Sequence, residues 1–234
     1  MPWIEHDYVS NEALVTQVAD VLVDACNRAS GEHRSAWLAL AGGRTPLPIY
    51  AALAAALPSA SMTVVTTDER CVPHKDPASN ITALRAAFAG HPGIVVNPLT
   101  REDGDERASL KQTRALLALN SQPFDAVLLG MGTDGHFASL FPGAANLAEG
   151  LALDSHRDAI ATLPEPLPPE APFARISLTL PRLLRAREVH LVVTGEAKRR
   201  VLRQVQHEGI GSGPYPVAAL LHARDHRVQI HWSP

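Results

Sequence analysis

Apolar residues follow two alternating patterns along the chain, one with helical spacing and one in short unbroken runs. Between residues 11 and 30 the apolar positions recur every three or four residues, as on the buried face of an amphipathic helix. The run from Ala36 to Ala41 is continuously apolar, which is typical of a parallel strand covered on both faces. It ends at Gly42-Gly43, which punctuates the change to the next element. The pattern therefore predicts a helix followed by a buried strand.

The same alternation continues to the end of the chain. Thr45 is expected to cap the next helix, with Pro46 in its first turn. Further helices are predicted near 46–57, 79–89, 103–119, from residue 196 and at 216–223, and strands at 62–65, 126–129, 189–193 and 228–232. Strands that alternate with helices indicate an α/β fold, a mostly parallel sheet with helices on both faces. Because the 234 residues show no linker or internal repeat, we expect a single domain over residues 1–234.

A proline-rich segment, residues 163–172, interrupts the alternation. Its prolines exclude a regular helix or a central strand. We interpret it as a rigid surface loop. The alternative is a wall of a binding site, because the candidate ligand-binding residue Arg175 follows it.

Composition and charge exclude several classes of protein. The formal net charge is −3, and the basic patch of a nucleic-acid or membrane-surface protein is missing. No apolar run approaches the ~20 residues that span a bilayer. The two cysteines cannot build a disulfide framework, and the first residues do not resemble a signal peptide. We therefore expect a cytoplasmic protein with no nucleic-acid or membrane partner.

Three polar segments stand at the ends of predicted strands, where parallel sheets bind their ligands. The first, Gly42 to Pro46, lets the backbone approach a ligand and presents free amides, an arrangement that binds phosphate. An ordinary strand-to-helix turn is the alternative. The segment lacks both the Walker A ending and the dinucleotide-binding glycine pattern.

The segment Gly130 to His136 carries the clearest catalytic chemistry. Its glycines, among them Gly132, permit a sharp backbone path after a buried strand. Asp134 and His136 then place a carboxylate and an imidazole together, and an imidazole accepts a proton from water at neutral pH. A metal site is the rival interpretation, but no second His or Cys stands at a ligand spacing, so no metal is expected.

The remaining candidates are charged residues whose meaning depends on the fold. Asp68 and Arg70 follow a strand and are suited to hydroxyl recognition and substrate contact. Arg175 and Lys198 are ordinary surface cations unless the fold brings them to the Thr45 loop. There they would complete a phosphate clamp.

Several motifs follow one another along the chain. They are Gly42-Gly43-Arg44-Thr45-Pro46, Asp68-Glu69-Arg70 with Ser79-Asn80, Asp134-Gly135-His136-Phe137-Ala138-Ser139-Leu140-Phe141-Pro142, Arg175-Ile176-Ser177 and Gly195-Glu196-Ala197-Lys198. Together they closely resemble the 6-phosphogluconolactonases, over residues 36–205. Cys71 and Phe137 depart from the family pattern, which usually has an aromatic residue and Thr there. Neither departure removes a catalytic group.

The resemblance implies hydrolysis of 6-phospho-D-glucono-1,5-lactone to 6-phosphogluconate in the oxidative pentose phosphate pathway. It also implies a Rossmann-like fold, a small sugar-phosphate substrate and no metal or organic cofactor. By the same analogy, Arg175 and Lys198 would join the Thr45 loop in binding the phosphate. We expect His136 to be the general base, with Asp134 orienting it. The expected substrate-binding residues are Gly42, Gly43, Arg44, Thr45, Asp68, Arg70, Gly132, Arg175 and Lys198.

Two alternatives remain open. Glucosamine-6-phosphate deaminases share the fold, but their pattern has an acid five residues after the His, where this chain has Phe141. A non-catalytic sugar-phosphate sensor would keep the phosphate loop and the cations but would not need His136.

Overall fold

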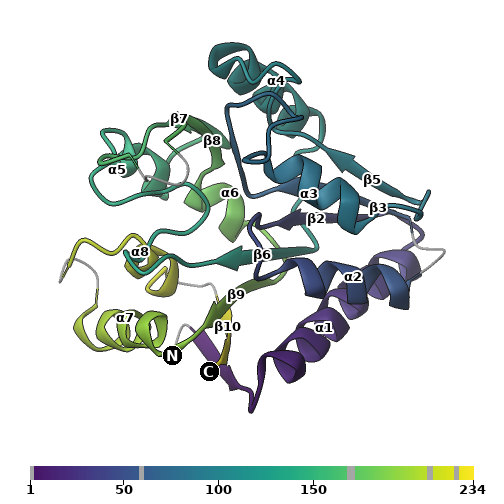
Figure 1. Cartoon of the computed structure of the whole chain (residues 1–234), viewed down its shortest axis with the longest axis horizontal. Helices are drawn as coiled ribbons and strands as arrows, with labels where there is room; N and C mark the ends of the chain where they lie inside the picture. Colours follow the sequence, from purple (N-terminus) through teal and green to yellow (C-terminus); the bar gives the residue numbers. More distant parts are fainter. Residues whose placement is uncertain (1–2, 58–60, 168–171, 210–212, 224–226) are drawn as a thin grey trace.

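Seven parallel strands form the central sheet (Figure 1). Their order is β1 (Trp3–Asp7), β10 (Val228–Ser233), β9 (Val189–Thr194), β6 (Ala126–Gly130), β2 (Ala36–Leu40), β3 (Met62–Thr66) and β5 (Ile94–Asn97). Each neighbouring pair runs parallel. The structure is a computed structural model that describes residues 3–57, 61–167, 172–209, 213–223 and 227–234. The predicted α/β fold with a mostly parallel sheet is confirmed.

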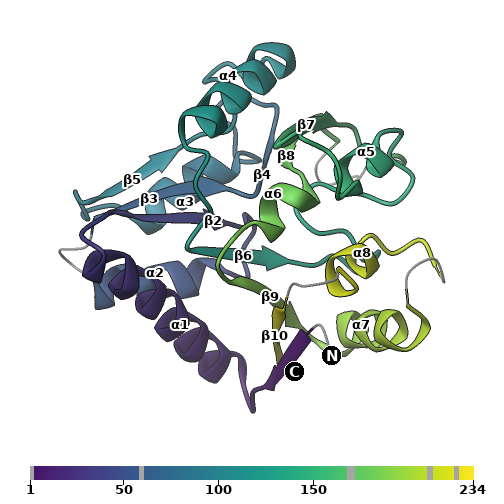
Figure 2. The same cartoon turned by 180° about the vertical axis from the view of Figure 1, so that it is seen from behind.

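Helices cover both faces of this sheet, because alternate residues of the buried strands point to opposite sides. On one face, Leu38 and Leu40 share a hydrophobic cluster with α1 (Asn11–Gly31), α2 (Leu47–Ala56) and α3 (Asn80–Ala87). On the other, Trp37 and Ala39 share a cluster with α4 (Glu106–Leu119), α6 (Leu180–Leu184), α7 (Glu196–Glu208) and α8 (Val217–Leu221). In Figures 1 and 2, α1 and α2 lie together on one side of β9 and β10, and α7 and α8 lie on the other.

Three short strands form a second, antiparallel sheet that the hydrophobic pattern does not predict. They are β4 (Asp68–Arg70), β8 (Arg175–Leu178) and β7 (Ala159–Thr162), in the order β4-β8-β7. The Asp68–Arg70 segment, expected as a loop after a strand, is therefore itself a strand. Strands of three or four residues are too short to show a period. The edge strand β5 and the short helices α5 (Leu147–Leu151) and α6 were missed because they are similarly short. The edge strand β1 was missed because only Trp3 and Ile4 of its five residues are apolar.

The predicted helices and strands lie within a few residues of the observed bounds, and two of the described helices begin at a residue whose own side chain forms the cap. Ser10 accepts a hydrogen bond from the amide of Ala13, and Asp105 accepts one from the amide of Ala108. The prediction that Thr45 caps α2 is wrong. Pro46 occupies the cap position and the helix has no side-chain cap, which leaves Thr45 exposed.

Within the part of the chain that the structure describes, no helix is both long and apolar enough to cross a bilayer.

The buried carboxylate of Asp125 joins the beginnings of the two central strands. It accepts the backbone N–H of Trp37 at 2.9 Å and both terminal nitrogens of Arg34 at 2.6 and 2.5 Å. Asp125 is 3% exposed, so these bonds replace the water that the carboxylate loses on folding. This contact fixes the start of β2 against the start of β6.

We expect Asp125→Asn to lower the free energy of unfolding by about 1–3 kcal/mol, because Arg34 then keeps, among the described residues, only the Glu32 carboxylate as a charged partner and one donor loses its acceptor. Asp103→Asn is the matched control, since Asp103 is exposed and lies 3.9 Å from Arg101. Urea denaturation at pH 7 measures both. Equal stability of the two variants would contradict a structural role for Asp125.

Candidate active site

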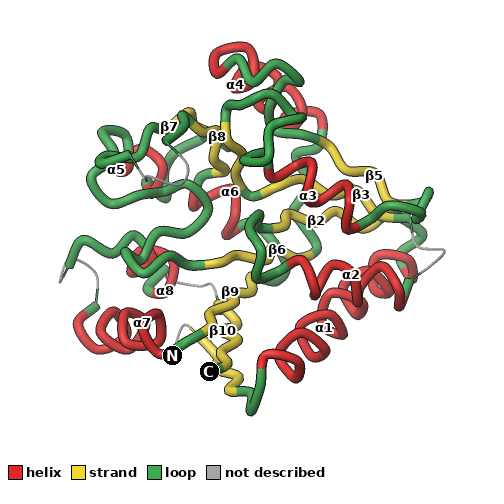
Figure 3. The backbone as a smooth tube through the Cα atoms, in the orientation of Figure 1, coloured by secondary structure: helices red, strands yellow, loops and turns green. Residues whose placement is uncertain are grey.

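The candidate site lies where the order of the central sheet reverses. From β2 the chain continues outward to β3 and β5, whereas β6 lies on the other side of β2 and leads to β9. Loops that leave the carboxyl ends of β2 and β6 therefore turn apart, and such a point is where open parallel sheets bind ligands. Figure 3 shows the long loop that follows β6 and runs to α5. A cavity of about 260 Å³ lies at this point.

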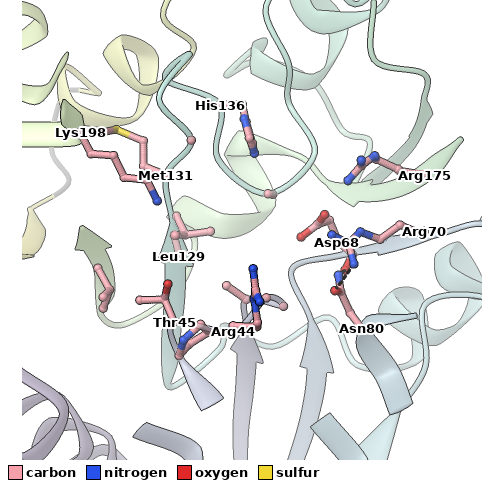
Figure 4. A pocket seen from close by; sticks show the side chains of 18 residues that line it. Arg44, Thr45, Asp68, Arg70, Asn80, Leu129, Met131, His136, Arg175 and Lys198 are labelled. Carbon is pink, nitrogen blue, oxygen red and sulfur yellow. Dashed lines mark hydrogen bonds between the residues drawn. The ribbon is translucent and has the colours of Figure 1, made fainter. Parts of the chain in front are cut away.

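The structure brings the predicted residues together at this cavity. Its lining includes His136 and all nine predicted substrate-binding residues, namely Gly42, Gly43, Arg44, Thr45, Asp68, Arg70, Gly132, Arg175 and Lys198. Asp134 does not line the cavity but contacts the imidazole of His136. In Figure 4, His136 enters from the top, opposite Arg44 and Thr45 at the bottom.

Asp134 holds His136 by two hydrogen bonds. Its Oδ1 lies 2.6 Å from Nδ1 of the imidazole and accepts the backbone N–H of His136 at 3.2 Å. Burial acts to raise the pKa of Asp134, but the hydrogen bonds and charge of His136 outweigh it, so this pKa is lowered. An ionised carboxylate only accepts hydrogen bonds, so Nδ1 carries the proton. Nε2 is then the ring nitrogen left to accept a proton.

Gly132 is required by the close approach of this pair. A Cβ atom at residue 132 would lie 2.3 Å from Nδ1 of His136 and 2.4 Å from Oδ1 of Asp134. The backbone N–H of Gly132 donates to the carbonyl of His136 at 2.9 Å, which closes the turn. Any larger residue would separate the imidazole from its carboxylate.

Cationic side chains approach the cavity from opposite sides (Figure 4). Lys198 comes from α7 on one side, and Arg70 and Arg175 come from the three-stranded sheet on the other. Arg70 and Arg175 are direct cross-strand partners, which explains how two residues far apart in sequence meet. Burial lowers the pKa of Lys198, and the Asp134 carboxylate partly offsets this effect. Together these charges suit a small anion.

Asn80 is a cavity residue that was not among the predicted site residues. Its Oδ1 accepts a hydrogen bond from Arg70 at 2.7 Å, and its Nδ2 donates to the carbonyl of Asp68 at 3.0 Å. A Cβ atom on Gly42 would lie 2.1 Å from Cγ of Asn80, so this glycine makes room for the amide. The sequence signal was the Ser79-Asn80 pair, which stands at the start of a predicted helix near the Asp68 segment.

Asp68 lines the cavity but already has partners within the protein. Its carboxylate accepts hydrogen bonds from the hydroxyls of Ser139 and Thr67, and the residue is 8% exposed. An ionised carboxylate has about four acceptor positions, so room for a ligand hydroxyl remains. Ser139 belongs to the loop after β6, so this contact ties that loop to β4.

The cavity lining includes none of the described residues of the proline-rich segment, 163–167 and 172. Residues 168–171 of this segment lie outside the described residues. Among the residues that the structure describes, no group of three His, Cys, Asp or Glu side chains is placed to hold a metal ion.

Comparison with known proteins gives this arrangement a family. A family described as glucosamine-6-phosphate isomerases/6-phosphogluconolactonase matches residues 9–232. The chain is 37% identical to the 6-phosphogluconolactonase of Caulobacter vibrioides, over 96% of this chain and 94% of that protein. The chain belongs to this family.

Solved structures show the same fold. A 6-phosphogluconolactonase from Shewanella baltica matches with a TM-score of 0.87 at 28% identity, covering 99% of this chain and 98% of the other. A monomeric glucosamine-6-phosphate deaminase matches with a TM-score of 0.78 at 20% identity, covering 97% and 96%. The family contains both activities, so the fold alone does not choose between them. The predicted resemblance to 6-phosphogluconolactonases is confirmed.

Glu69 is a second residue beside the site that was not predicted. It is fully buried, and its carboxylate accepts the backbone N–H groups of Arg70, Asn80 and Ile81 at 2.8, 2.8 and 2.6 Å. It thereby caps α3, whose cap residue Ser79 makes no side-chain bond. Burial raises the pKa of Glu69 to about 7, and the three backbone donors only partly offset this rise.

This raised pKa predicts a pH-dependent stability. Between pH 4.5 and about 7, Glu69 keeps a proton in the folded state that the unfolded state has released. The contribution of Glu69 to the free energy of unfolding is therefore fully present below pH 4.5 and is lost as the pH rises through 7. Residue 69 cannot ionise in Glu69→Gln. Relative to this variant, the free energy of unfolding of the wild type should fall by about 3 kcal/mol between pH 4.5 and pH values above 7. Urea denaturation between pH 4.5 and 8 measures the difference.

The exposed Glu106 on α4 supplies the control for that experiment. Glu106→Gln should leave the pH dependence of stability between pH 5 and 8 unchanged. If wild type and Glu69→Gln follow parallel curves, Glu69 does not titrate in this range.

Proposed function

We propose that the protein hydrolyses 6-phospho-D-glucono-1,5-lactone to 6-phospho-D-gluconate, in the oxidative pentose phosphate pathway. Membership of the family supports this function, as does the full-length similarity to named 6-phosphogluconolactonases. The observation that carries it is the 2.6 Å contact between Asp134 and His136 at a cavity lined by cations. This geometry supplies a base and an anion site within one small space.

In this proposal the phosphate group is bound by Arg175, Lys198 and the loop from Gly42 to Thr45. The two side chains reach the cavity from opposite sides, so a dianion between them interacts with both charges. Asp68 accepts hydrogen bonds from sugar hydroxyls, and Arg70 contacts the substrate. Binding at the phosphate fixes the lactone carbonyl relative to His136, which reduces the entropic cost of reaction.

His136 acts as the general base. Nε2 takes a proton from a water molecule while the water oxygen attacks the lactone carbonyl carbon. The tetrahedral intermediate then expels the ring oxygen, which takes the proton back from the imidazolium. Asp134 holds the ring in the required tautomer and stabilises its positive charge in the intermediate. A lactone is an activated ester, so neither a nucleophilic Ser or Cys nor a cofactor is part of the proposal.

Deamination of glucosamine 6-phosphate is the nearest alternative, because a family member with this fold carries that activity. The reaction moves protons at sugar carbons and at the ring oxygen, which calls for further acid–base groups. At the position where the deaminase pattern has an acid, Phe141 packs on His136 with ring centroids 4.1 Å apart. Release of ammonia from glucosamine 6-phosphate would favour the deaminase.

A sugar-phosphate sensor is the second alternative. It would bind the ligand through the same cations but would gain nothing from the Asp134–His136 pair. Tight binding without turnover would favour it.

We further propose a cytoplasmic location, supported by the free thiols of Cys26 and Cys71.

Replacing the proposed base tests the chemistry. His136→Ala should lower kcat by about 10²–10⁴-fold, the usual contribution of general-base catalysis, with little change in KM. His207→Ala is the control, because His207 is exposed near the end of α7. Lactone hydrolysis is followed by acid release and corrected for spontaneous opening. A His136→Ala enzyme that keeps most of its rate above background would refute the assignment.

Replacing the proposed phosphate ligand tests binding separately. Lys198→Met should weaken binding of the product 6-phosphogluconate by about 10–100-fold, since a charge-assisted hydrogen bond is lost. Because burial lowers the pKa of Lys198, wild-type affinity should fall as the pH rises toward the ordinary lysine range. Lys198→Arg should keep its affinity there, and calorimetry between pH 7 and 10 measures both effects.

The exposed Lys111 on α4 provides the charge-matched control. Lys111→Met removes the same charge and should leave affinity unchanged. If Lys198→Arg loses affinity over the same pH range as the wild type, another group causes the alkaline effect.

A further inference from the structure

We propose that Phe141 is a positioning residue that holds both the proposed base His136 and the proposed phosphate ligand Arg175. The inference rests on the proposed function, since it assigns Phe141 a part in that reaction. Phe141 is 6% exposed and does not line the cavity, so it acts through its neighbours.

The first contact is with the face of the His136 ring. The ring centroids of Phe141 and His136 lie 4.1 Å apart with 28° between the planes. The hydrogen bond that Nδ1–H donates to Asp134 fixes one edge of the imidazole but still allows the ring plane to rotate about that edge. A flat contact on the ring face removes this rotation. Asp134 and Phe141 together therefore determine where Nε2 points.

The second contact is with the guanidinium of Arg175. Its Cζ lies 4.9 Å from the centroid of the same Phe141 ring, within the range of a cation–π contact. Arg175 is 4% exposed and belongs to β8, whereas Phe141 belongs to the loop after β6. One ring thus joins the element that carries the base to the element that carries the cation.

This shared contact has a consequence for geometry. The distance between base and cation determines how a phosphorylated lactone lies against the imidazole. Because both groups pack on one buried ring, displacement of the ring changes kcat through His136 and KM through Arg175. A residue that only fills space would change stability alone.

Phe124 offers a matched control within the same chain. It is fully buried, its ring lies 5.1 Å from the ring of Trp37, and Cζ of Arg182 lies 4.2 Å above it. Phe124 therefore has the same two kinds of partner as Phe141. Neither Phe124 nor its two partners lines the cavity.

The experiment compares Phe141→Leu with Phe124→Leu in lactone hydrolysis and thermal unfolding. Both variants should unfold at a lower temperature than the wild type. Only Phe141→Leu should lower kcat, by about tenfold, and raise KM several-fold, which correspond to losses of about 1.4 kcal/mol or less each. Phe141→Tyr keeps the ring, so its kcat and KM should stay within about threefold of the wild-type values. A change of this size corresponds to the loss of one weak contact at most.

A double-mutant cycle separates positioning from packing. In a His136→Ala background, Phe141→Leu should change the residual kcat by less than about twofold, because the group it positions is gone. In an Arg175→Met background, the effect of Phe141→Leu on KM should likewise vanish. If Phe141→Leu does not fold, Phe141→Met, with a more flexible apolar side chain, replaces it throughout.

Three results would overturn the inference. They are wild-type kcat and KM in Phe141→Leu, equal kinetic losses in Phe124→Leu, and an undiminished effect of Phe141→Leu in the His136→Ala background. An inactive wild type would instead refute the proposed lactonase function. The two failures are therefore distinguishable.

Discussion

The parallel pairing of β2 with β6 is the contact on which the site depends. Only three residue pairs are in register, from Leu38 with Ala126 to Leu40 with Leu128, and the amide of Ala41 then donates to the carbonyl of Leu128. Beyond this point the segments that follow β2 and β6 turn apart. The space between them is the cavity, so its position follows from strand order rather than from any single side chain.

Side chains at the cavity are held in two different ways. Asp134 and His136 are two residues apart, and a tight turn without a side chain at Gly132 brings them together. Arg70, Arg175 and Asn80 are held instead by contacts between distant segments, through the β4–β8 pairing and the start of α3. Local contacts make the proton-accepting group, and long-range contacts arrange the charges around it.

This difference explains how much the sequence could predict. The amphipathic helix at residues 11–30 was predicted because its apolar residues recur with a helical period, and the buried strands were predicted because they are short, unbroken apolar runs. The Asp134–His136 pair was predicted because its residues are neighbours in the chain. The β4–β8 pairing, the capping role of Glu69 and the double contact of Phe141 were not predicted. The β4–β8 pairing and the contact of Phe141 with Arg175 join residues that are distant in sequence, and Glu69 accepts the backbone N–H of Asn80, 11 residues later. Neither composition nor period reports such contacts.

The cross-strand pairing of Arg70 with Arg175 has a further consequence for stability. It places two guanidinium groups on adjacent strands, with the Lys198 ammonium across the cavity. The described residues that line the cavity contain one carboxylate, that of Asp68, so positive side chains outnumber negative ones there and attract an anion. An anion that binds only the folded state stabilises the protein. Ligand binding and resistance to unfolding therefore increase together at this pair of strands.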